Sequence, residues 1–207
     1  NKISIPSNIK IISSYAFQNC INLTKVEFPI DSKLQIIEEY LFHESNIKEI
    51  YIPSTVLKIK NHAFSYCINL TKVEIPINSN LQIIKSDAFS SSYINKIFIP
   101  SKVSKICKNA FSCCRKLTHV EIPANSNLEI IDVEAFQYSN IEEIFIPSKV
   151  SKICKHAFGS CRNLKIVEIS EESKLESFPF IAFNCYTHLM IMIPTSLEKL
   201  IHINKSI

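Results

Sequence analysis

Apolar and polar residues alternate along short stretches of this chain, as in Val73-x-Ile75, and each stretch ends at a proline. Such alternation is typical of a strand with one buried face. Proline ends the strand because it has no amide to donate to the next ladder position. A second apolar pair, such as Val56-x-x-Ile59, turns another edge inward. The pattern therefore predicts many short strands around one core.

The prolines recur at nearly constant intervals of alternately 23 and 24 residues, and Ser170 stands where one more proline is expected. A phenylalanine marks the same repeat independently, with steps of alternately 25 and 22 residues, and alanine precedes it everywhere except at Leu41. The two sets are Pro6, Pro29, Pro53, Pro76, Pro100, Pro123, Pro147 and Pro194, and Phe17, Phe42, Phe64, Phe89, Phe111, Phe136, Phe158 and Phe183. Both periods sum to 47 residues, so the unit is a pair of coils present four times.

The segment Leu70-x-x-Val73-x-Ile75 follows the LxxLxL pattern of leucine-rich repeats. One coil cannot bury its apolar face, but stacked coils form a continuous core and align their strands ~4.8 Å apart. The sequence predicts a leucine-rich-repeat solenoid of eight coils of alternating 23 and 24 residues, with a parallel concave β-sheet. We expect short helical, 3-10 or strand segments on the convex side, a helical or 3-10 turn at 60–67, and one internal column of phenylalanines.

The consensus IPxxVxxIxxxAFxxCxxLxxVxIP resembles the BspA-like class of leucine-rich repeats over roughly residues 3 to 200. That class is known from surface proteins of oral bacteria and parasitic protists. The even coils depart from it, since serine replaces the cysteine and one residue is missing before the strand, and residues 178–194 match it weakly. The resemblance implies a cell-surface or extracellular module that recognises host or matrix proteins.

We interpret residues 1–207 as a single leucine-rich-repeat domain. Asn1 enters in mid-coil and residues 194–200 begin a ninth coil that is not completed, so we expect a fragment of a longer repeat protein. Solenoid ends without a polar capping repeat expose apolar surface. End-to-end or side-by-side self-association is therefore also expected.

Composition argues against several other functions. The chain has one glycine, Gly159, whereas phosphate-binding loops need several positive-φ positions. The net charge is +4 without a dense Lys/Arg cluster, so nucleic acid is not an expected partner. No apolar run approaches the ~20 residues that span a bilayer. We predict no cofactor.

Eight cysteines and six histidines raise the questions of disulfides and zinc. The main cysteines lie on alternate coils, ~10 Å apart, whereas a disulfide needs Cα atoms within roughly 7 Å. We expect this row to be small, buried and weakly hydrogen-bonding, with a Cys161–Cys185 bond as the alternative; its members are Cys20, Cys67, Cys114 and Cys161. Finger-type cysteine pairs are missing, so no metal site is predicted. His62 and His156 recur at one repeat position and are expected to be solvated turn residues.

Catalytic residues should break the repeat, because a residue present in every second coil serves the coil. Serines such as Ser54 and Ser101 recur after the prolines, and the irregular positions offer no acid–base pair. We therefore predict that the chain is not an enzyme.

Residues between the buried strand positions point outward and form two rows on the concave face. One row reads Lys25, Glu49, Lys72, Lys96, His119, Glu143, Ile166 and Met190. The other reads Glu27, Tyr51, Glu74, Phe98, Glu121, Phe145, Glu168 and Met192. Exposed aromatic residues commonly mark interaction sites, so we expect a protein ligand here. The alternative is that each aromatic residue merely covers the stems of neighbouring lysines and glutamates.

Three functions follow from these features. The first is a surface adhesin or recognition module, which the resemblance favours. The second is an intracellular protein-interaction scaffold, and the third is a structural spacer without its own ligand. Sequons at Asn22, Asn69 and Asn204 would carry sugars in a glycosylating secretory pathway.

Overall fold

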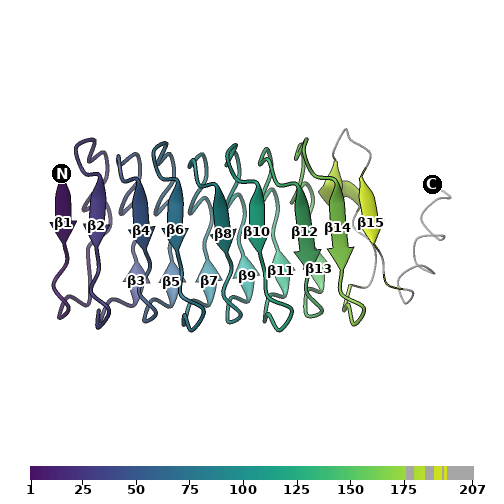
Figure 1. The fold of residues 1–207 in the computed structure, drawn as a ribbon, viewed down its shortest axis with the longest axis horizontal. Helices are drawn as coiled ribbons and strands as arrows, with labels where there is room; N and C mark the ends of the chain where they lie inside the picture. Colours follow the sequence, from purple (N-terminus) through teal and green to yellow (C-terminus); the bar gives the residue numbers. More distant parts are fainter. Residues whose placement is uncertain (176–179, 185–188, 193, 195–207) are drawn as a thin grey trace.

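In the computed structural model, which describes residues 1–175, 180–184, 189–192 and 194, the coils stack along an almost straight line (Figure 1). Nine parallel strands form one sheet, ordered β1-β2-β4-β6-β8-β10-β12-β14-β15, with one coil of the chain leading from each strand to the next. These strands are β1 Lys2–Ser4, β2 Lys25–Glu27, β4 Glu49–Tyr51, β6 Lys72–Glu74, β8 Lys96–Phe98, β10 His119–Glu121, β12 Glu143–Ile146, β14 Ile166–Ile169 and β15 Met190–Met192. The predicted leucine-rich-repeat solenoid is confirmed.

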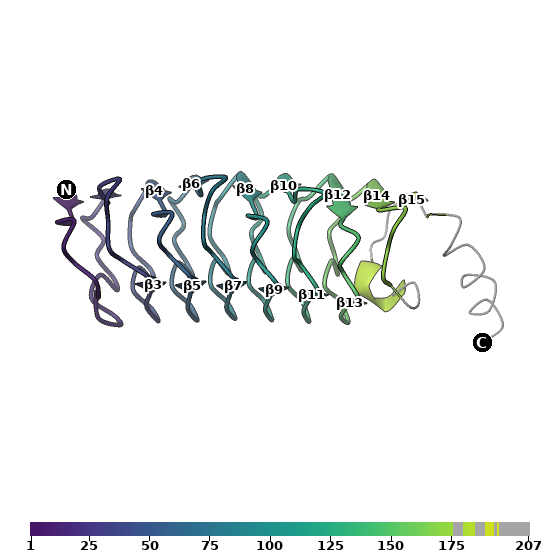
Figure 2. The ribbon, with the colours of Figure 1, turned by 90° about the horizontal axis from the view of Figure 1, so that it is seen from below.

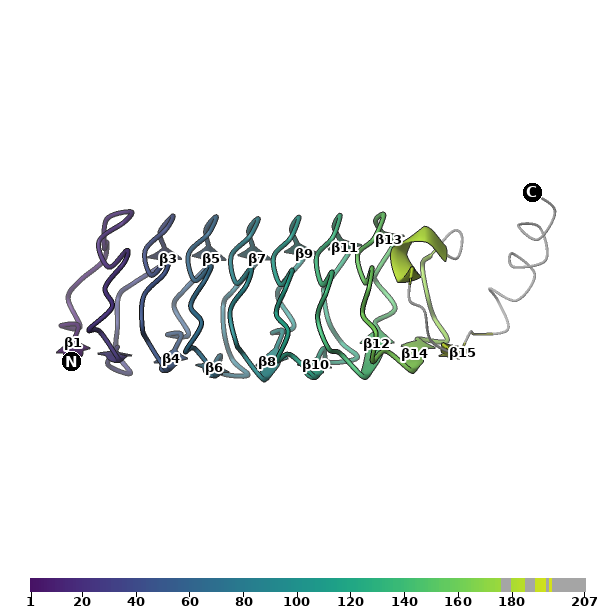
Figure 3. The ribbon, with the colours of Figure 1, turned by 90° about the horizontal axis from the view of Figure 1, so that it is seen from above.

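A six-stranded parallel sheet lines the opposite side of the stack (Figures 2 and 3). Its strands are β3 Ile36–Ile37, β5 Lys58–Ile59, β7 Ile83–Ile84, β9 Lys105–Ile106, β11 Ile130–Ile131 and β13 Lys152–Ile153. The second residue of each strand is a buried isoleucine. Val56 and Ile59 are both fully buried, so the second apolar edge faces the core as predicted.

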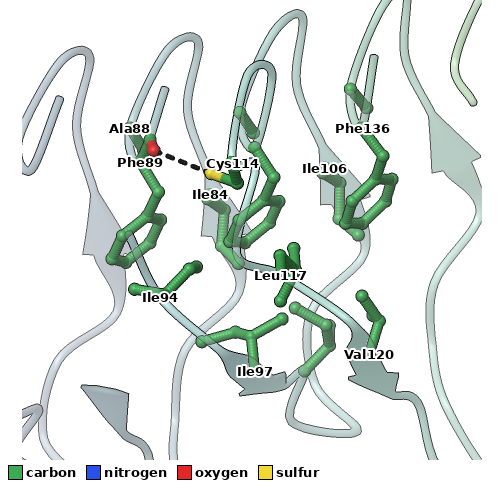
Figure 4. Close-up of a cluster of buried hydrophobic side chains, with 14 of the residues drawn as sticks. Ile84, Ala88, Phe89, Ile94, Ile97, Ile106, Cys114, Leu117, Val120 and Phe136 are labelled. Atoms are coloured by element: carbon green, nitrogen blue, oxygen red, sulfur yellow. Dashed lines mark hydrogen bonds between the residues drawn. The ribbon is translucent and has the colours of Figure 1, made fainter. Parts of the chain in front are cut away.

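The predicted column of phenylalanines is present in the core. Neighbouring rings stack nearly parallel, with centroids 4.9 to 5.4 Å apart and interplanar angles of 2° to 12°. Six of the eight rings are fully buried, whereas Phe17, in the first coil, is half-buried. Figure 4 shows Phe89 and Phe136 packed among the isoleucines of both sheets, including Ile84, Ile97 and Ile106.

The segments around the phenylalanines are turns, so the helical prediction was wrong for residues 60–67. The described part of the chain contains a single helix, the 3-10 helix η1 Phe180–Phe183, which fits the prediction in the last coil. Residues 60–67 form no helix because left-handed residues stand two positions before and two after the phenylalanine, at His62 (φ 56°) and Tyr66 (φ 58°), and the same holds around every column phenylalanine from Phe17 to Phe158. Such residues interrupt the run of right-handed dihedrals that a helix requires.

Alternate amides of this turn, those of the two left-handed residues and of the phenylalanine between them, bond to the neighbouring coil. The N–H groups of His62, Phe64 and Tyr66 donate to carbonyls of the next coil at 3.1, 2.7 and 2.8 Å, whereas that of Ser65 donates within its own turn, to His62. Fourteen described residues adopt this conformation and none of them is glycine. His62 lies in a turn as predicted, but its ring stacks on that of Tyr40, with centroids 4.6 Å apart, instead of standing free in solvent.

Three members of the cysteine row, Cys67, Cys114 and Cys161, are buried and hydrogen-bonded as predicted, whereas Cys20 in the first coil is only partly buried. The thiol of Cys114 donates to the carbonyl of Phe89 at 3.0 Å (Figure 4), and its sulfur lies 3.5 Å from the hydroxyl of Ser92 on the preceding coil. Cys67 and Cys161 make equivalent bonds. Burial raises the pKa of Cys114 to about 12, so the thiol stays protonated at neutral pH and remains a donor. The alternative Cys161–Cys185 bond involves Cys185, which lies outside the described residues.

Candidate functional site

The outer face of the nine-stranded sheet carries two continuous rows of side chains. The first and third residues of each strand point outward, and the register aligns them from coil to coil, for example Tyr51 beside Glu74 and Phe145 beside Glu168. We call these rows the strand stripe. The first-position row is Lys2, Lys25, Glu49, Lys72, Lys96, His119, Glu143, Ile166 and Met190. The third-position row is Ser4, Glu27, Tyr51, Glu74, Phe98, Glu121, Phe145, Glu168 and Met192.

All the residues predicted to bind a ligand lie in the strand stripe. Lys2 and Ser4 were not predicted, because β1 lacks the preceding half-coil that identifies the other strands. The register of β1 with β2 nevertheless places them at the N-terminal end of the same two rows.

In the N-terminal half of the stripe, on β1, β2, β4 and β6, the charged residues pair with one another. Lys2 and Glu27 lie 2.7 Å apart and Lys25 and Glu49 lie 2.8 Å apart, while Lys72 contacts Glu74. The hydrogen bond between Lys25 and Glu49 raises the pKa of the lysine and lowers that of the carboxyl. Three lysines and three glutamates therefore neutralise each other here.

The C-terminal half of the stripe, on β8, β10, β12, β14 and β15, is acidic and apolar. Its charged members are one lysine and three glutamates, and no ion pair joins them to any residue that the structure describes: Lys96, Glu121, Glu143 and Glu168. Its apolar members range from half-buried aromatic rings to methionines that are 63 % and 51 % exposed: Phe98, Phe145, Ile166, Met190 and Met192.

Open hollows lie between the aromatic residues of the third-position row. One of about 330 Å³ spans β4 to β10, between Tyr51 and Phe98. Another of about 320 Å³ spans β10 to β14 beside Phe145, and a third of about 440 Å³ lies between Phe145 and Met192. The stripe therefore presents alternating rings and shallow depressions, a relief suited to an elongated ligand.

A side-chain arrangement that the sequence analysis missed lies away from the stripe. Nδ1 of His43 lies 2.6 Å from the Ser65 hydroxyl and Nε2 lies 3.3 Å from Glu44, in the order of a Ser-His-acid triad. The possible signal was a histidine directly after a column phenylalanine, a position that is histidine in this coil alone. Ser65 is fully buried and donates to the carbonyl of His62 at 3.0 Å, so no substrate carbonyl can approach it. The contact of His43 with Ser65 links two neighbouring coils.

The described residues offer neither a metal site nor a membrane-spanning helix. They contain no group of three or more His, Cys, Asp or Glu side chains placed to hold a metal ion. No helix within these ranges is long and apolar enough to cross a membrane. Asn22 and Asn69 of the sequons are exposed, and Asn204 lies outside the described residues.

The repeat identified above corresponds to a known family. A family model described as the BspA type leucine-rich repeat region matches in six copies, over residues 1–118 and 104–205. The chain belongs to the BspA-type leucine-rich-repeat family. The resemblance seen in the consensus is thereby confirmed, and leucine-rich repeats of this type are modules for protein interaction.

Solved structures share the fold of this BspA-type chain. The pneumococcal vaccine antigen PcpA is 26 % identical, with a TM-score of 0.66 over 95 % of this chain and 51 % of PcpA. A leucine-rich repeat protein from Bacteroides ovatus is 22 % identical, with a TM-score of 0.67 over 92 % of this chain and 54 % of that protein. The chain thus spans about half the length of these two proteins. A comparison with curated proteins finds no significant match.

Proposed function

We propose that this BspA-type chain is a non-catalytic recognition module, displayed at the cell surface, that binds a host or matrix protein through the strand stripe. The observation that carries the proposal is the C-terminal half of the stripe. There, Phe98, Phe145 and two exposed methionines lie among carboxylates that have no ion-pair partner among the described residues.

The aromatic residues are not required by the stack itself. Coils of the N-terminal half form the same sheet with lysine and glutamate at many equivalent outward positions, and the core lies entirely on the other face. Aromatic side chains bury a large area while losing little rotamer freedom, which makes them effective anchors for a partner protein. A binding role therefore accounts for Phe98 and Phe145 better than the covering of charged neighbours.

Surface display is supported by relatives. PcpA is described as a vaccine antigen, and this chain shares its fold over nearly the whole of its own length. A surface module on a straight solenoid would hold its sheet face accessible along the stack (Figure 1).

Replacing both anchors tests the proposal. We expect Phe98→Ser/Phe145→Ser to weaken binding to a matrix protein, selected from a panel of purified extracellular-matrix proteins, by at least tenfold, since anchor residues typically contribute about 2 kcal/mol each. Surface plasmon resonance gives the affinities, and circular dichroism checks that the variant is folded. The matched control is Ile30→Ser/Ile77→Ser, which removes apolar residues that are 91 % and 85 % exposed but lie outside the stripe.

Two results would contradict this function. Unchanged affinity of the folded stripe variant would move the binding surface elsewhere. Failure of every matrix protein to bind would favour the scaffold or spacer alternatives.

A further inference from the structure

Building on that proposed function, we propose that the segment bound by the strand stripe is an extended polyproline-II peptide, with an apolar residue such as proline at every third position and basic side chains between. Three features of the stripe support this ligand class: the spacing of its anchors, the hollows between them and its charge.

The spacing of the anchors matches a polyproline-II helix. Tyr51, Phe98, Phe145 and Met192 lie on every second strand of the third-position row, so neighbouring anchors are ~9.6 Å apart at the usual strand spacing. A polyproline-II helix repeats every three residues, or ~9.3 Å, and so presents one side chain per anchor. The two repeats differ by only ~0.3 Å, so they remain in step over all four anchors.

Other peptide conformations fit this row less well. An extended strand presents same-side residues every ~6.7 Å, which falls out of step after one anchor. The apolar stripe of an α-helix has contacts about every 5 Å along its axis, and therefore meets every strand. In the third-position row, strands β6, β10 and β14 present Glu74, Glu121 and Glu168, so every second contact of such a helix would meet a carboxylate.

The hollows recur with the same two-coil period. The hollow of about 330 Å³ includes Phe98 in its lining and that of about 320 Å³ includes Phe145, and glutamates line both. Aromatic-lined depressions that receive alternate side chains are the general means of binding polyproline-II segments. Lys96 and His119, beside Phe98, add N–H donors for peptide carbonyls that have no internal hydrogen bond.

The charge of the C-terminal half selects a basic ligand. Although the whole chain carries +4, this half of the stripe holds three glutamates against one lysine. Glu171 and Glu172 add two more carboxylates at the hollow beside Met192. The residues just before β12 and β14 are Glu142 and Lys165, whose opposite charges leave the net charge of this half unchanged. A peptide with lysine or arginine between its apolar residues would pair with these carboxylates.

Fluorescence anisotropy with three labelled twelve-residue peptides tests the inference. The probes are four repeats of Pro-Pro-Lys, four repeats of Pro-Pro-Glu, and a helix-forming alanine peptide with four lysines. We expect the Pro-Pro-Lys peptide to bind at least tenfold more tightly than either of the others. Its affinity should fall at least tenfold in Phe98→Ser/Phe145→Ser and in Glu121→Gln/Glu168→Gln, because these variants remove the rings and the charges separately.

Two matched controls should leave that affinity within twofold. Glu129→Gln removes an exposed carboxylate next to β11, on the sheet opposite the stripe, and Ile30→Ser/Ile77→Ser removes exposed apolar residues outside the stripe. Equal or tighter binding of the helical peptide, or Pro-Pro-Lys binding that the stripe variants leave unchanged, would overturn the inference.

The outcome also separates this inference from the function on which it rests. If a matrix protein binds through Phe98 and Phe145 but the Pro-Pro-Lys peptide does not bind, the ligand class is wrong and the proposed function stands. If neither a matrix protein nor any peptide binds through the stripe, both are wrong.

Discussion

The turn positions flanking each column phenylalanine set the backbone path of a coil. Ser91 has a φ of 59°, and its N–H donates to the carbonyl of Ser112 on the next coil at 2.8 Å. The N–H of Ser90, one residue earlier, instead donates within its own turn, to Asp87 at 3.1 Å. The amide of Phe89, between the two left-handed positions of this turn, also donates to the next coil, whereas that of Ser90 does not. At Ser91 the structure therefore depends on a backbone conformation and not on a particular side chain.

Substitution of Ser91 by a β-branched residue should expose this dependence. We expect Ser91→Val to lower the free energy of unfolding by about 1–2 kcal/mol, because valine at positive φ is strained. Ser91→Asn should be nearly neutral, since asparagine tolerates this region. Urea unfolding followed by circular dichroism gives the values, with Ser90→Val as the control for a branched side chain in the same turn. Equal losses from Ser90→Val and Ser91→Val would show that φ is not the cause.

Sequence reasoning located these residues but not their conformation. The left-handed positions hold tyrosine, histidine, aspartate, asparagine, glutamate, serine and cysteine, without a glycine to reveal them. The turn at 60–67 was therefore predicted to be helical. The ion pairs of the stripe were missed for a related reason, because the contact of Lys25 with Glu49 depends on side-chain rotamers and cross-strand register, which the sequence alone does not specify.

Among the elements, the phenylalanine column joins the two sheets into one core. Phe111 is fully buried between Phe89 and Phe136, with ring centroids 5.2 and 5.1 Å away. Phe17 is half-buried and stacks on Phe42 alone among the described rings, with centroids 5.4 Å apart. The same residue type at the same repeat position thus has different packing in the middle and at the first coil.

Truncation of the two rings should therefore have unequal effects. We expect Phe111→Ala to lower the free energy of unfolding by about 3–5 kcal/mol, through lost burial and the cavity that remains. Phe17→Ala should lower the free energy of unfolding by less than half of this amount, because the ring of Phe17 is already partly exposed to water. Chemical denaturation of both variants provides the comparison, and losses of the same size would argue against a column whose stability depends on neighbours on both sides.

The two sheets differ in how far the sequence could predict them. Strands such as β6, Lys72–Glu74, follow from period-2 alternation and a terminating proline. Those of the second sheet, such as β5, Lys58–Ile59, are too short to show a period, so strands were predicted there only as an alternative to helical or 3-10 segments. The 47-residue repeat supplied the register, since residues one repeat apart must occupy equivalent places in the stack.

At the scale of the whole molecule, the repeat copies the backbone while the charge pattern of the stripe changes along it. Lys25 and Glu49 pair in the N-terminal half, whereas Glu121 and Glu143 have no ion pair with any described residue. The sequence predicted both rows of the stripe because alternation determines which side chains face outward. It could not predict which half is self-neutralised, since pairing depends on how the side chains of neighbouring coils orient toward one another.

A stack in which each coil contacts only its neighbours should open from its ends. The amide of Phe17 donates to the carbonyl of Leu41 at 3.0 Å, and that of Phe111 donates to Ala135 at 2.7 Å, so both are hydrogen-bonded in the native state. Releasing the first coil breaks one interface between coils, whereas exposing Phe111 breaks two or requires the stack to open coil by coil. We therefore expect Phe17 to exchange its amide hydrogen at least tenfold faster than Phe111.

Native-state hydrogen exchange, read by mass spectrometry on peptides covering 11–23 and 105–117, measures this difference after correction for the intrinsic rate of each segment. Phe111→Ala weakens the middle of the stack, so that the central interfaces open more easily. This variant should therefore reduce the difference in exchange rate between the two segments. Equal protection of the two segments in the unaltered chain would mean that all coils unfold as one cooperative unit. In that case the nearest-neighbour description would be wrong, and a substitution at any one coil would act on the stability of the entire stripe.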